Sequence, residues 1–471
     1  MDDRHKPFRA WDAMEGRHET VSAAEVLPEG DLVYFLLELI PRLDLAPFYA
    51  FYSMDHRGQP PFNVTMMVTL LVYSYSIGVF SSRKIAMACE RNLAFMAIVG
   101  KDPPNFRTIS EFRKNHLAAL KPLFLEVLRY AGELGMVRLG NLSTDGTKID
   151  ANASRHKAMS YGYMSKELER LKEEIAQLLK EAAQVDAEQD ATQGTRRGDE
   201  LPDEIKRRED RIQKIEAAKA RLEAEAQARA DAEQRERDAA QAQREAEGRS
   251  RRGKEPAPVD PTPKDKAQTN FTDPDSKIMK KSNKGFDYAY NAQAVVDGEH
   301  QIIVAALATD AANDKQQAVP MAQAAMENIT AAGIERPRDE KGELQLIPNT
   351  ADSGYFSETN VPAVTAEGFD PYYAVGREKH HEPKQPTLTG AEATTASTPK
   401  ECMANKLRTE LGKQLYAARK HIVEPVFGQI KRIRGFRKFS LRGLQKVTAE
   451  WDLVCLTHNL LKIWKFSKGC T

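Results

Sequence analysis

Residues 141–150, NLSTDGTKID, mark the point at which the sequence changes from a helical pattern to a strand pattern. If this stretch is extended, Asp145 faces the same side as two hydroxyl side chains while the other side packs. The residues before it, about 20–135, read as consecutive helices, and residues from about 269 onward return to strands. This order predicts an α/β protein, with an all-α N-terminal domain followed by a mixed sheet flanked by helices.

Later segments supply the other strands of the predicted sheet. FDYAYNAQAVVDG and HQIIVAALATD are consistent with a hairpin that turns at Asp297 and Gly298. A helix is expected at about residues 315–329, and LQLIPNTADSGYF then reads as a strand that runs out into Asp352. FDPYYAV follows as a further strand, and the polar residues 377–400 are expected to form a flexible loop.

The helical N-terminal region contains an apolar stretch, residues 62–80, that carries no charged side chain. Its length approaches the roughly 20 residues that span a bilayer. Its polar residues, its glycine and the two prolines before it favour a buried core helix instead. Further on, the capping-box pattern of Thr108 and Glu111 predicts a helix start.

This helical domain, about residues 20–135, has the size of domains that dock on DNA. Four of its side chains suit phosphate contact, although each taken singly is at least as consistent with an ordinary solvated charge. These are Arg107, Arg113, Lys114 and His116.

Residues 166–268 interrupt the strand pattern. Apolar residues at three-four spacing from Leu168 to Val185, and again from Ile205 to Ala226, predict two helices folded back on each other. After about Arg229 the sequence becomes rich in Ala, Gln and charge and then in Pro, which predicts a fraying helix and a flexible return. We expect a coiled-coil-like insertion that acts as a solvated spacer, with dimerisation or DNA contact as alternatives.

Composition sets the outer limits of the interpretation. A chain of 471 residues suffices for two to four domains, and its four cysteines lack metal-binding spacing, which indicates free thiols in a reducing cytosol. The N-terminus has no signal-peptide core, so secretion is not expected. Residues 401–471 carry 15 Lys and Arg against five Asp and Glu, a net charge of +10, which predicts a nucleic-acid partner.

Three acidic residues stand in contexts that would direct a carboxylate to one point: Asp145, Asp352 and Glu424. Hard divalent cations such as Mg²⁺ take oxygen ligands, and phosphoryl transfer with two such ions needs carboxylates from separate elements of a rigid fold. The sequence therefore predicts a metal-dependent nuclease. The reserve candidates for this role are Asp150, Asp310 and Asp314.

The segment YAARKHIVEPVFGQIK resembles the tyrosine-arginine-glutamate-lysine signature of bacterial insertion-sequence transposases of the DDE type, through Tyr416, Arg419, Glu424 and Lys431. STDGTKIDANAS, ADSGYFS, VEPVFGQIK, GFRKFSLRG and HNLLK are similar to further blocks of that family, in the expected order. This sequence departs from the signature in having four residues between Arg419 and Glu424 where the strictest form has three. Pro425 in addition predicts a kink or a fresh helix start at Glu424.

The resemblance implies a ribonuclease-H-like catalytic domain made of residues 140–165 and 269–471. It implies that Asp145 and Asp352 on neighbouring strands, and Glu424 on the C-terminal helix, are the catalytic residues and ligate two Mg²⁺ ions, for which Mn²⁺ can substitute. The implied enzyme cleaves the ends of its insertion sequence and joins them to target DNA. It would act as a homo-oligomer in the bacterial cytoplasm, without membrane association.

Helical spacing places Glu424 and Lys431 on one face, so the Lys431 ammonium would hold a phosphate beside the metal ions. For Phe436 and Phe439 we expect packing rather than base stacking. Trp451 and Trp464 are also expected in the core. DNA contacts are expected from Tyr416, Arg419, Lys431, Arg432, Arg434, Arg437 and Lys438.

Two alternatives to a transposase remain open. One is a related ribonuclease-H-like nuclease that cleaves DNA without strand transfer. The other is a transposase-derived DNA-binding protein that is catalytically inactive, against which the retention of all three acids argues. A coiled-coil scaffold would explain the insertion but not the strands and acids around it.

Overall fold

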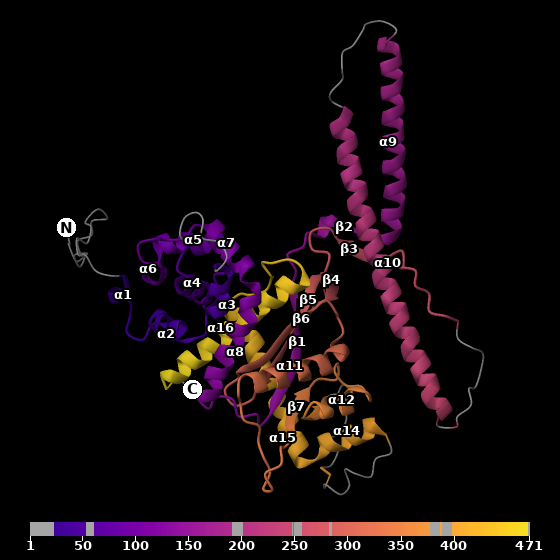
Figure 1. Ribbon diagram of the computed structural model, residues 1–471. Helices are drawn as coiled ribbons and strands as arrows, with labels where there is room; N and C mark the ends of the chain where they lie inside the picture. Colours follow the sequence, from indigo (N-terminus) through magenta and orange to yellow (C-terminus); the bar gives the residue numbers. More distant parts are fainter. Residues whose placement is uncertain are drawn as a thin grey trace, which may run out of the picture.

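The chain forms a helical N-terminal region, a mixed sheet with helices on both faces, and a long helical arm (Figure 1). The computed structural model describes residues 23–52, 61–190, 201–246, 248, 257–281, 285–376, 387–388 and 398–469. Most of the loop expected at 377–400, and the break expected between the two insertion helices, lie outside these residues.

Short helices build the N-terminal region, as the sequence predicts. Asn63 caps the helix α4, because its side chain accepts a hydrogen bond from Met66 N (3.0 Å), and α4 is buried along almost its whole length. No helix among the described residues is long and apolar enough to cross a membrane. The helices are α1 (Ala23–Val26), α2 (Leu32–Leu39), α3 (Ala46–Tyr49), α4 (Val64–Ser76), α5 (Ser82–Arg91), α6 (Leu93–Val99), α7 (Phe106–Asn115) and α8 (Leu117–Glu133).

The start of α7 differs from the sequence-based expectation. The helix begins at Phe106, and the side chain of Asn105 accepts hydrogen bonds from Arg107 N (2.9 Å) and Thr108 N (3.0 Å). The predicted capping box at Thr108 and Glu111 is therefore wrong. Asn105 caps the helix one turn earlier, since an asparagine oxygen satisfies the same free amides.

The described residues form a six-stranded mixed sheet around β1. β1 pairs antiparallel with β5 on one side and parallel with β7 on the other, and β8 continues parallel beyond β7. β4 and β6 pair with different parts of the far edge of β5. The strands are β1 (Leu142–Asp150), β4 (Lys277–Lys280), β5 (Phe286–Asp297), β6 (Ile303–Thr309), β7 (Ile347–Ala351) and β8 (Phe369–Tyr373).

The predicted hairpin of β5 and β6 is confirmed, and it turns just after Asp297. The Asp297 carboxylate is buried and accepts hydrogen bonds from the amides of Leu139 (2.9 Å) and Glu299 (3.1 Å). Leu139 has φ +57, a conformation that non-glycine residues rarely adopt. The turn therefore holds the segment that leads into β1.

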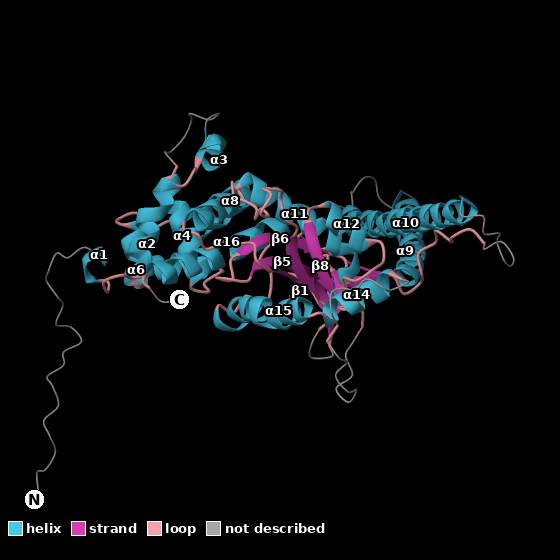
Figure 2. Cartoon of the chain, turned by 90° about the horizontal axis from the view of Figure 1, so that it is seen from below, coloured by secondary structure: helices cyan, strands magenta, loops and turns pink. Residues whose placement is uncertain are grey.

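Helices cover both faces of the sheet. α15 (Glu410–Gly428) and α14 (Pro399–Arg408) lie on one face, and α11 (Ala318–Ala331) and α12 (Asn360–Ala366) on the other (Figure 2). α11 follows a short 3-10 turn, η4 (Asp314–Gln317), and confirms the helix expected near 315–329. The mixed α/β class predicted from the sequence is confirmed.

The helix α16 (Leu444–Ser467) lies between the sheet and the N-terminal helices, and its residues from Val447 to Leu460 are largely buried. Its polar side chains bind backbone groups of the sheet. Asn459 accepts a hydrogen bond from Ile303 N (2.8 Å) and donates one to Ile303 O (2.9 Å), as a neighbouring strand would. Trp451, which the sequence placed in the core, is fully buried and donates to Gln293 O.

A buried polar network joins α16 to the N-terminal helices. The Tyr75 hydroxyl donates to Glu450 Oε1 (2.7 Å), and Arg113 Nη1 donates to the Tyr75 hydroxyl (2.8 Å). Arg113 and His116 are 6% and 3% exposed, so the expectation that they contact phosphate is wrong. Helical spacing could not reveal the burial of Arg113, because the Tyr75 hydroxyl that accepts its hydrogen bond also binds Glu450, more than 300 residues away in the chain.

Pro425 does not break α15, although the sequence predicts a kink or a fresh start there. A proline has no N–H, so the carbonyl of His421, four residues earlier, loses its helical donor. The side chain of Gln301, in the β5–β6 turn, donates to that carbonyl at 2.8 Å. Lys462 of α16 donates to the amide oxygen of Gln301 (2.7 Å) and holds it in place. The turn thus supplies the hydrogen bond that the proline removes.

The arm consists of α9 (Tyr161–Asp190) and α10 (Leu201–Ala246), which pack against each other as the sequence predicts. Their shared core includes Met164, Leu168 and Ile215. At the base, the short strands β2 (Ala158–Ser160) and β3 (Gln268–Asn270) pair antiparallel and hold the two ends of the insertion together. The helix expected to fray after about Arg229 instead continues to Ala246.

The base of the arm also touches the start of α16. Asp275 accepts a hydrogen bond from Leu444 N (2.7 Å), and Asp273 accepts one from Gly443 N (3.0 Å). Gly443 has φ +85 and offers no side chain of its own to cap the helix. Arg221 of α10 donates to the other oxygen of Asp275 at 2.6 Å. A carboxylate that follows the arm therefore caps the central helix.

Asp452 on α16 gives a pH-dependent prediction. Burial raises its pKa to about 7, above the ordinary 3.8, and nearby Lys121 offsets this only in part. Because the folded chain holds this proton more tightly than the unfolded chain, the stability it contributes is complete below about pH 4 and is lost as the pH rises through 7. We expect Asp452→Asn to be more stable than the parent at pH 8 by on the order of 2–4 kcal/mol, with a smaller difference at pH 5.

Denaturant unfolding at the two pH values measures this difference. Glu358→Gln, at an exposed position, is the matched control and should change stability at neither pH. Equal stability of Asp452→Asn and the parent at pH 8 would contradict a charged aspartate buried at this position.

Candidate active site

The parallel pairing of β1 and β7 brings two of the predicted acids together. The last pair in this ladder is Thr144 with Ala351, so Asp145 and Asp352 are the next residue on each strand. β7 ends there whereas β1 continues to Asp150, which leaves the edge of β1 open beside both carboxylates. Two carboxylates are thus held side by side at the point where the sheet splits.

Each aspartate accepts a hydrogen bond from a glycine amide just after it in the chain. Asp145 Oδ1 accepts a hydrogen bond from Gly146 N, and Asp352 Oδ1 accepts one from Gly354 N, both at 2.8 Å. The Arg419 guanidinium lies 3.3 Å from Asp145 Oδ2. Burial raises the pKa of Asp145 to about 6, an effect that Arg419 opposes and the charge of Asp352 reinforces. The site therefore carries more negative charge than Arg419 alone balances.

Glu424 is exposed on α15 and does not join the two aspartates in this structure. At about 100° per residue, an acid four positions after Arg419 would lie on the same helix face, whereas five positions place Glu424 about 140° away. The residue four positions on is Val423, which is fully buried. The extra residue between Arg419 and Glu424, noted in the sequence, thus decides where the glutamate points.

Lys431 lies beyond the end of α15, where the helix geometry changes. A π-helical turn, η5 (Gln429–Ile433), follows α15 and holds more residues per turn than an α-helix. Lys431 turns toward β1, where it donates to Thr147 Oγ1 (2.7 Å) and to Lys148 O (3.0 Å). Its ammonium therefore lies two residues from Asp145 along the strand.

The expected meeting of three acids at a metal site is only partly reproduced. Across the described part of the chain, no three His, Cys, Asp or Glu side chains are placed to hold a metal ion together. The donor chemistry nevertheless fits a hard cation, because the open edge presents carboxylates and a buried amide oxygen, Asn291 Oδ1, that has no hydrogen-bond partner. The residues that fit a divalent cation are those around Asp145 and Asp352.

A third carboxylate, Asp314, lies at this edge. Its Oδ1 accepts hydrogen bonds from Asn291 Nδ2 (2.6 Å) and Gln293 Nε2 (2.9 Å) and lies 3.3 Å from Lys148 Nζ. Tyr355 in turn donates to Gln293 Oε1. Of the other reserve acids, Asp150 pairs with Lys281. Sequence reasoning missed Asn291 and Gln293, although two polar residues at alternate positions of an apolar strand were the available signal.

A groove of about 410 Å³ begins at Gly146, beside Asp145, and is rich in cations. Burial lowers the pKa of Lys431, and the charges of Lys281 and Arg437 lower it further, whereas the nearby Asp150 carboxylate opposes this shift. Such a crowd of cations is relieved by an anion. The lining residues are Gly146, Thr147, Lys148, Asp150, Lys281, Lys431 and Arg437.

Comparison with known families places two segments of the chain. Residues 21–115 match the family described as transposase domain (DUF772), and residues 379–464 match the family described as transposase DDE domain. Both matched families are transposase families. The chain therefore carries a transposase N-terminal domain and a transposase DDE domain. Neither a curated protein nor a solved structure matches it.

The DDE match contains Arg419, Glu424 and Lys431, whereas Asp145 and Asp352 lie between the two matched segments. The assignment of the two aspartates therefore rests on strand geometry and on the sequence resemblance.

The basic residues expected to contact DNA divide into two groups. Arg432, Arg437 and Lys438 are exposed, and Tyr416 is half-buried with Arg419 above its ring. Arg434 is only 6% exposed, and it donates to Val454 O (3.1 Å) and Thr457 Oγ1 (2.7 Å) of α16. Burial also lowers its pKa to about 10. Arg434 is therefore removed from the DNA-contacting candidates, because it is a packing residue of the core.

The aromatic residues between these cations pack as predicted. Phe436 and Phe439 are buried, and their ring centroids lie 5.4 Å apart in an edge-on contact. The nearby Trp451 ring stacks on Phe436 at 6.5 Å. The expectation of packing rather than base stacking is confirmed.

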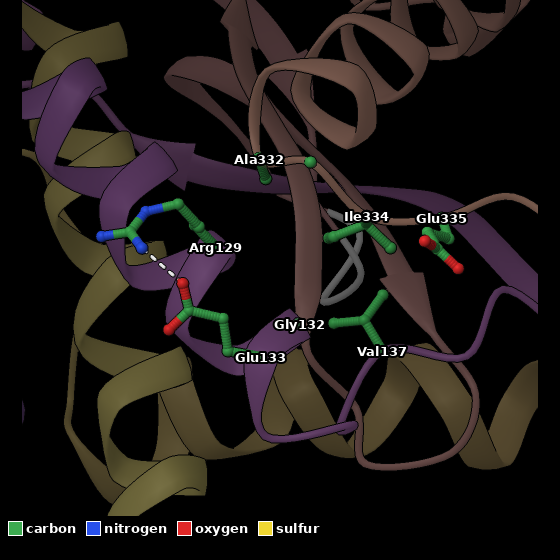
Figure 3. Close-up of a pocket in the computed structure, with 8 residues that line it drawn as sticks. Arg129, Gly132, Glu133, Val137, Ala332, Ile334 and Glu335 are labelled. Carbon is green, nitrogen blue, oxygen red and sulfur yellow. Dashed lines mark hydrogen bonds and ion pairs between the residues drawn. The ribbon is translucent and has the colours of Figure 1, made fainter.

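A cavity of about 560 Å³ lies between the end of α8 and the segment after α11 (Figure 3). Its only ion pair among the residues drawn, Arg129 with Glu133, neutralises itself, and Ile334 and Val137 form an apolar wall. It shares no lining residue with the acidic edge or the groove. It is not the active-site candidate.

The two arginine environments give a paired prediction. Arg434→Gln should lower the free energy of unfolding by about 2 kcal/mol or more, because buried acceptors on α16 lose a charged donor. Arg437→Gln, at an exposed position, should change it by less than about 0.5 kcal/mol but weaken DNA binding. Denaturant unfolding and a DNA-binding titration on both variants check this, and the reverse pattern would contradict the assignment of Arg434 to the core.

Proposed function

We propose that this chain is a DDE transposase that cleaves the ends of its own insertion sequence and joins them to target DNA. The observation that carries the proposal is the placement of Asp145 and Asp352 as the next residues after the last β1–β7 pair, beside a cation-lined groove. An acidic edge next to a basic groove suits a reaction at a phosphodiester, since one binds metal ions and the other binds phosphates.

The topology supports a ribonuclease-H-like catalytic domain. β5 pairs antiparallel with β1, and β6 pairs antiparallel with β5. On the other side of β1, β7 pairs parallel with β1, and β8 pairs parallel with β7. The arm and β4 lie between β1 and β5 in the sequence. We assign residues 140–165 and 269–471 to this domain and residues 20–135 to DNA docking. The arm at 166–268 is the insertion between β2 and β3.

In this proposal the chain's own residues orient the reacting groups. Asp145 and Asp352 would hold Mg²⁺ or Mn²⁺, which when bound activates the attacking oxygen and stabilises the leaving one. Gly146 N and Gly354 N orient the two carboxylates, as their hydrogen bonds indicate. Lys431 and the exposed Arg437 would bind phosphates of the DNA and fix the strand along the edge of β1.

We propose Glu424 as the third catalytic and metal-ligating acid. This role rests on the resemblance and on the DDE match that contains the residue. The DNA contacts proposed are Tyr416, Lys431, Arg432, Arg437 and Lys438. Arg419 was also expected to contact DNA, but it is only 8% exposed and pairs with Asp145, so we assign it to positioning that carboxylate. A homo-oligomer is proposed for the active complex, since two transposon ends have to be processed together.

One observation favours a second candidate, a transposase-derived protein that binds DNA without cutting it. Arg419 pairs with Asp145, and Glu424 is exposed rather than near the aspartates. An inactive descendant would keep the groove but not an assembled acidic site. A nuclease without strand transfer is the third outcome, and only the reaction products distinguish it.

A cleavage assay tests the proposal. Purified protein with Mg²⁺ should cut DNA that carries the terminal repeats, and Asp145→Asn and Asp352→Asn should each reduce the rate by more than about a hundredfold. Asp310→Asn, which removes an acid outside the groove lining, is the matched control. Glu424→Gln in the same assay shows whether the exposed glutamate contributes.

Wild-type rates in both aspartate variants would show that the site is wrongly assigned. DNA binding without any cleavage in Mg²⁺ or Mn²⁺ would favour the inactive descendant. Cleaved ends that are never found joined to target DNA would favour the nuclease.

The groove gives a prediction of its own for DNA binding. Lys281→Gln removes a cation that lines the groove, whereas Lys280→Gln removes an exposed cation from the adjacent position. Lys280 is the last residue of β4, whereas Lys281 follows it and pairs with Asp150, which also lines the groove, and with Asp287. In Lys281→Gln the slope of log affinity against log salt should fall by about 1, with no change in Lys280→Gln. Equal slopes in both variants would show that DNA does not enter the groove.

A further inference from the structure

Asp314 is far from Asp145 in the sequence but lies near both Asp145 and Asp352 in the fold. It belongs to η4, on the α11 side of the sheet, whereas Asp145 is on β1 and Asp352 follows β7. The charge of Asp314 acts on Asp145, as does that of Asp352. Three carboxylates from three separate elements therefore face the same open edge.

Two glycines make this approach possible. A Cβ atom on Gly146 would lie 3.0 Å from Asp314 Oδ1 and only 2.2 Å from Gln293 Nε2. A Cβ atom on Gly354 would lie 2.9 Å from Asp352 Oδ1 and 3.7 Å from Asp314 Oδ2. Each glycine follows one of the aspartates, and each leaves open the space that a side chain would take beside Asp314. The oxygens of Asp352 and Asp314 thus flank the same point at Gly354.

The described hydrogen bonds of Asp314 all use its Oδ1, whereas its Oδ2 lies on the side of Asp352. Oδ1 accepts from Asn291 and Gln293 and pairs with Lys148. Oδ2 is the oxygen that lies near Gly354. A carboxylate fixed through one oxygen presents the other in a defined direction, as carboxylates bound to cations commonly do.

Asn291 supplies an independent indication of a ligand. Its side chain is fully buried, and its Nδ2 donates both to Ala311 O (3.2 Å) and to Asp314 Oδ1 (2.6 Å). Its Oδ1 therefore cannot be exchanged with Nδ2, and this oxygen has no partner. Oδ1 lies 2.8 Å from the Cβ position of Gly146, at the acidic edge. A buried oxygen without a donor is costly unless a ligand satisfies it.

We propose that Asp314 supplies a third carboxylate to the divalent-cation site of Asp145 and Asp352, through its Oδ2. This rests on the proposed function. In the structure Arg419 pairs with Asp145 and Lys148 pairs with Asp314, and the carboxylates of the described residues do not close on one point. Lys148 contacts Oδ1 and leaves Oδ2 to the cation, but its positive charge acts on all three carboxylates and therefore opposes a cation bound between them.

A simpler role for Asp314 is to neutralise the half-buried Lys148. The two roles differ once Lys148 is absent. If Asp314 only neutralises Lys148, then Asp314→Asn should not weaken cation binding further in a chain that already carries Lys148→Gln. If Asp314 is a cation ligand, Asp314→Asn weakens cation binding with or without Lys148.

Titration of the full chain with Mn²⁺, without DNA, measures this by calorimetry or by the electron paramagnetic resonance of free Mn²⁺. Asp314→Asn should weaken Mn²⁺ affinity by about tenfold or more, because an amide replaces a charged ligand. Lys148→Gln should tighten it by severalfold, since it removes a positive charge beside the carboxylates. Asp314→Asn added to Lys148→Gln should again weaken Mn²⁺ affinity by about tenfold, because the ligand is lost in either background. Glu327→Gln, at an exposed position of α11, should bind Mn²⁺ as the parent does.

Unchanged Mn²⁺ affinity in Asp314→Asn, or weakening in both Asp314→Asn and Lys148→Gln, would overturn the proposal. If circular dichroism shows that Asp314→Asn does not fold, the double variant is compared with Lys148→Gln instead, and equal Mn²⁺ affinity of these two overturns the proposal. Asp145→Asn and Asp352→Asn serve as references. Parent-like Mn²⁺ binding in both of them would remove the cation site of the proposed function itself, whereas their loss with an unaffected Asp314→Asn removes only the role of Asp314.

Discussion

The burial of α16 is the constraint on which the rest of the structure depends. A helix enclosed by protein has to satisfy its polar side chains internally, because an unpaired buried group costs more than a hydrogen bond contributes. Glu450 meets Tyr75 of the N-terminal region, and Asn459 meets the backbone of β6. Arg434, which follows the π-helical turn after α15, donates hydrogen bonds to Val454 O and Thr457 Oγ1 of α16. The helical region, the sheet and the basic segment are therefore positioned by one set of buried contacts rather than by separate cores.

The chemistry gathers where the sheet is incomplete. β7 stops at Ala351 and β1 continues, so the backbone of β1 beyond Thr144 has a free edge that side chains occupy. On this edge the carboxylates of Asp145 and Asp352 lie near the buried amide side chains of Asn291 and Gln293 on β5. Cations follow farther along β1. The carboxylates and the cations therefore lie only a few residues apart along β1. This spacing suits a DNA strand, in which the phosphate that reacts and the neighbouring phosphates are also close together.

The sequence predicted the elements better than their orientations. Alternation identified β1 and β7, and parallel pairing then brings Asp145 beside Asp352 without further information. The direction of Glu424 depends on the rotation of α15, which one extra residue changes by about 100°. Arg434 could not be separated from its exposed neighbours, because composition does not show which cation of a basic segment turns inward. Partners such as Gln301, which replaces a hydrogen bond lost to a proline, lie too far apart in the chain for local patterns to reveal.

Asp275 gives the arm a fixed point. It binds Arg221 of α10 through one oxygen and the first amide of α16 through the other. From Arg221 to Ala246 the helix extends about 37 Å at 1.5 Å per residue. A rotation of about 10° at that carboxylate would displace the far end by roughly 6 Å, given this helical rise. Asp275 is thus both the point about which the arm would rotate and the cap of α16. A small displacement at the base of the arm would correspond to a large one at its far end, so a contact that holds the far end would also restrain the N-terminus of α16.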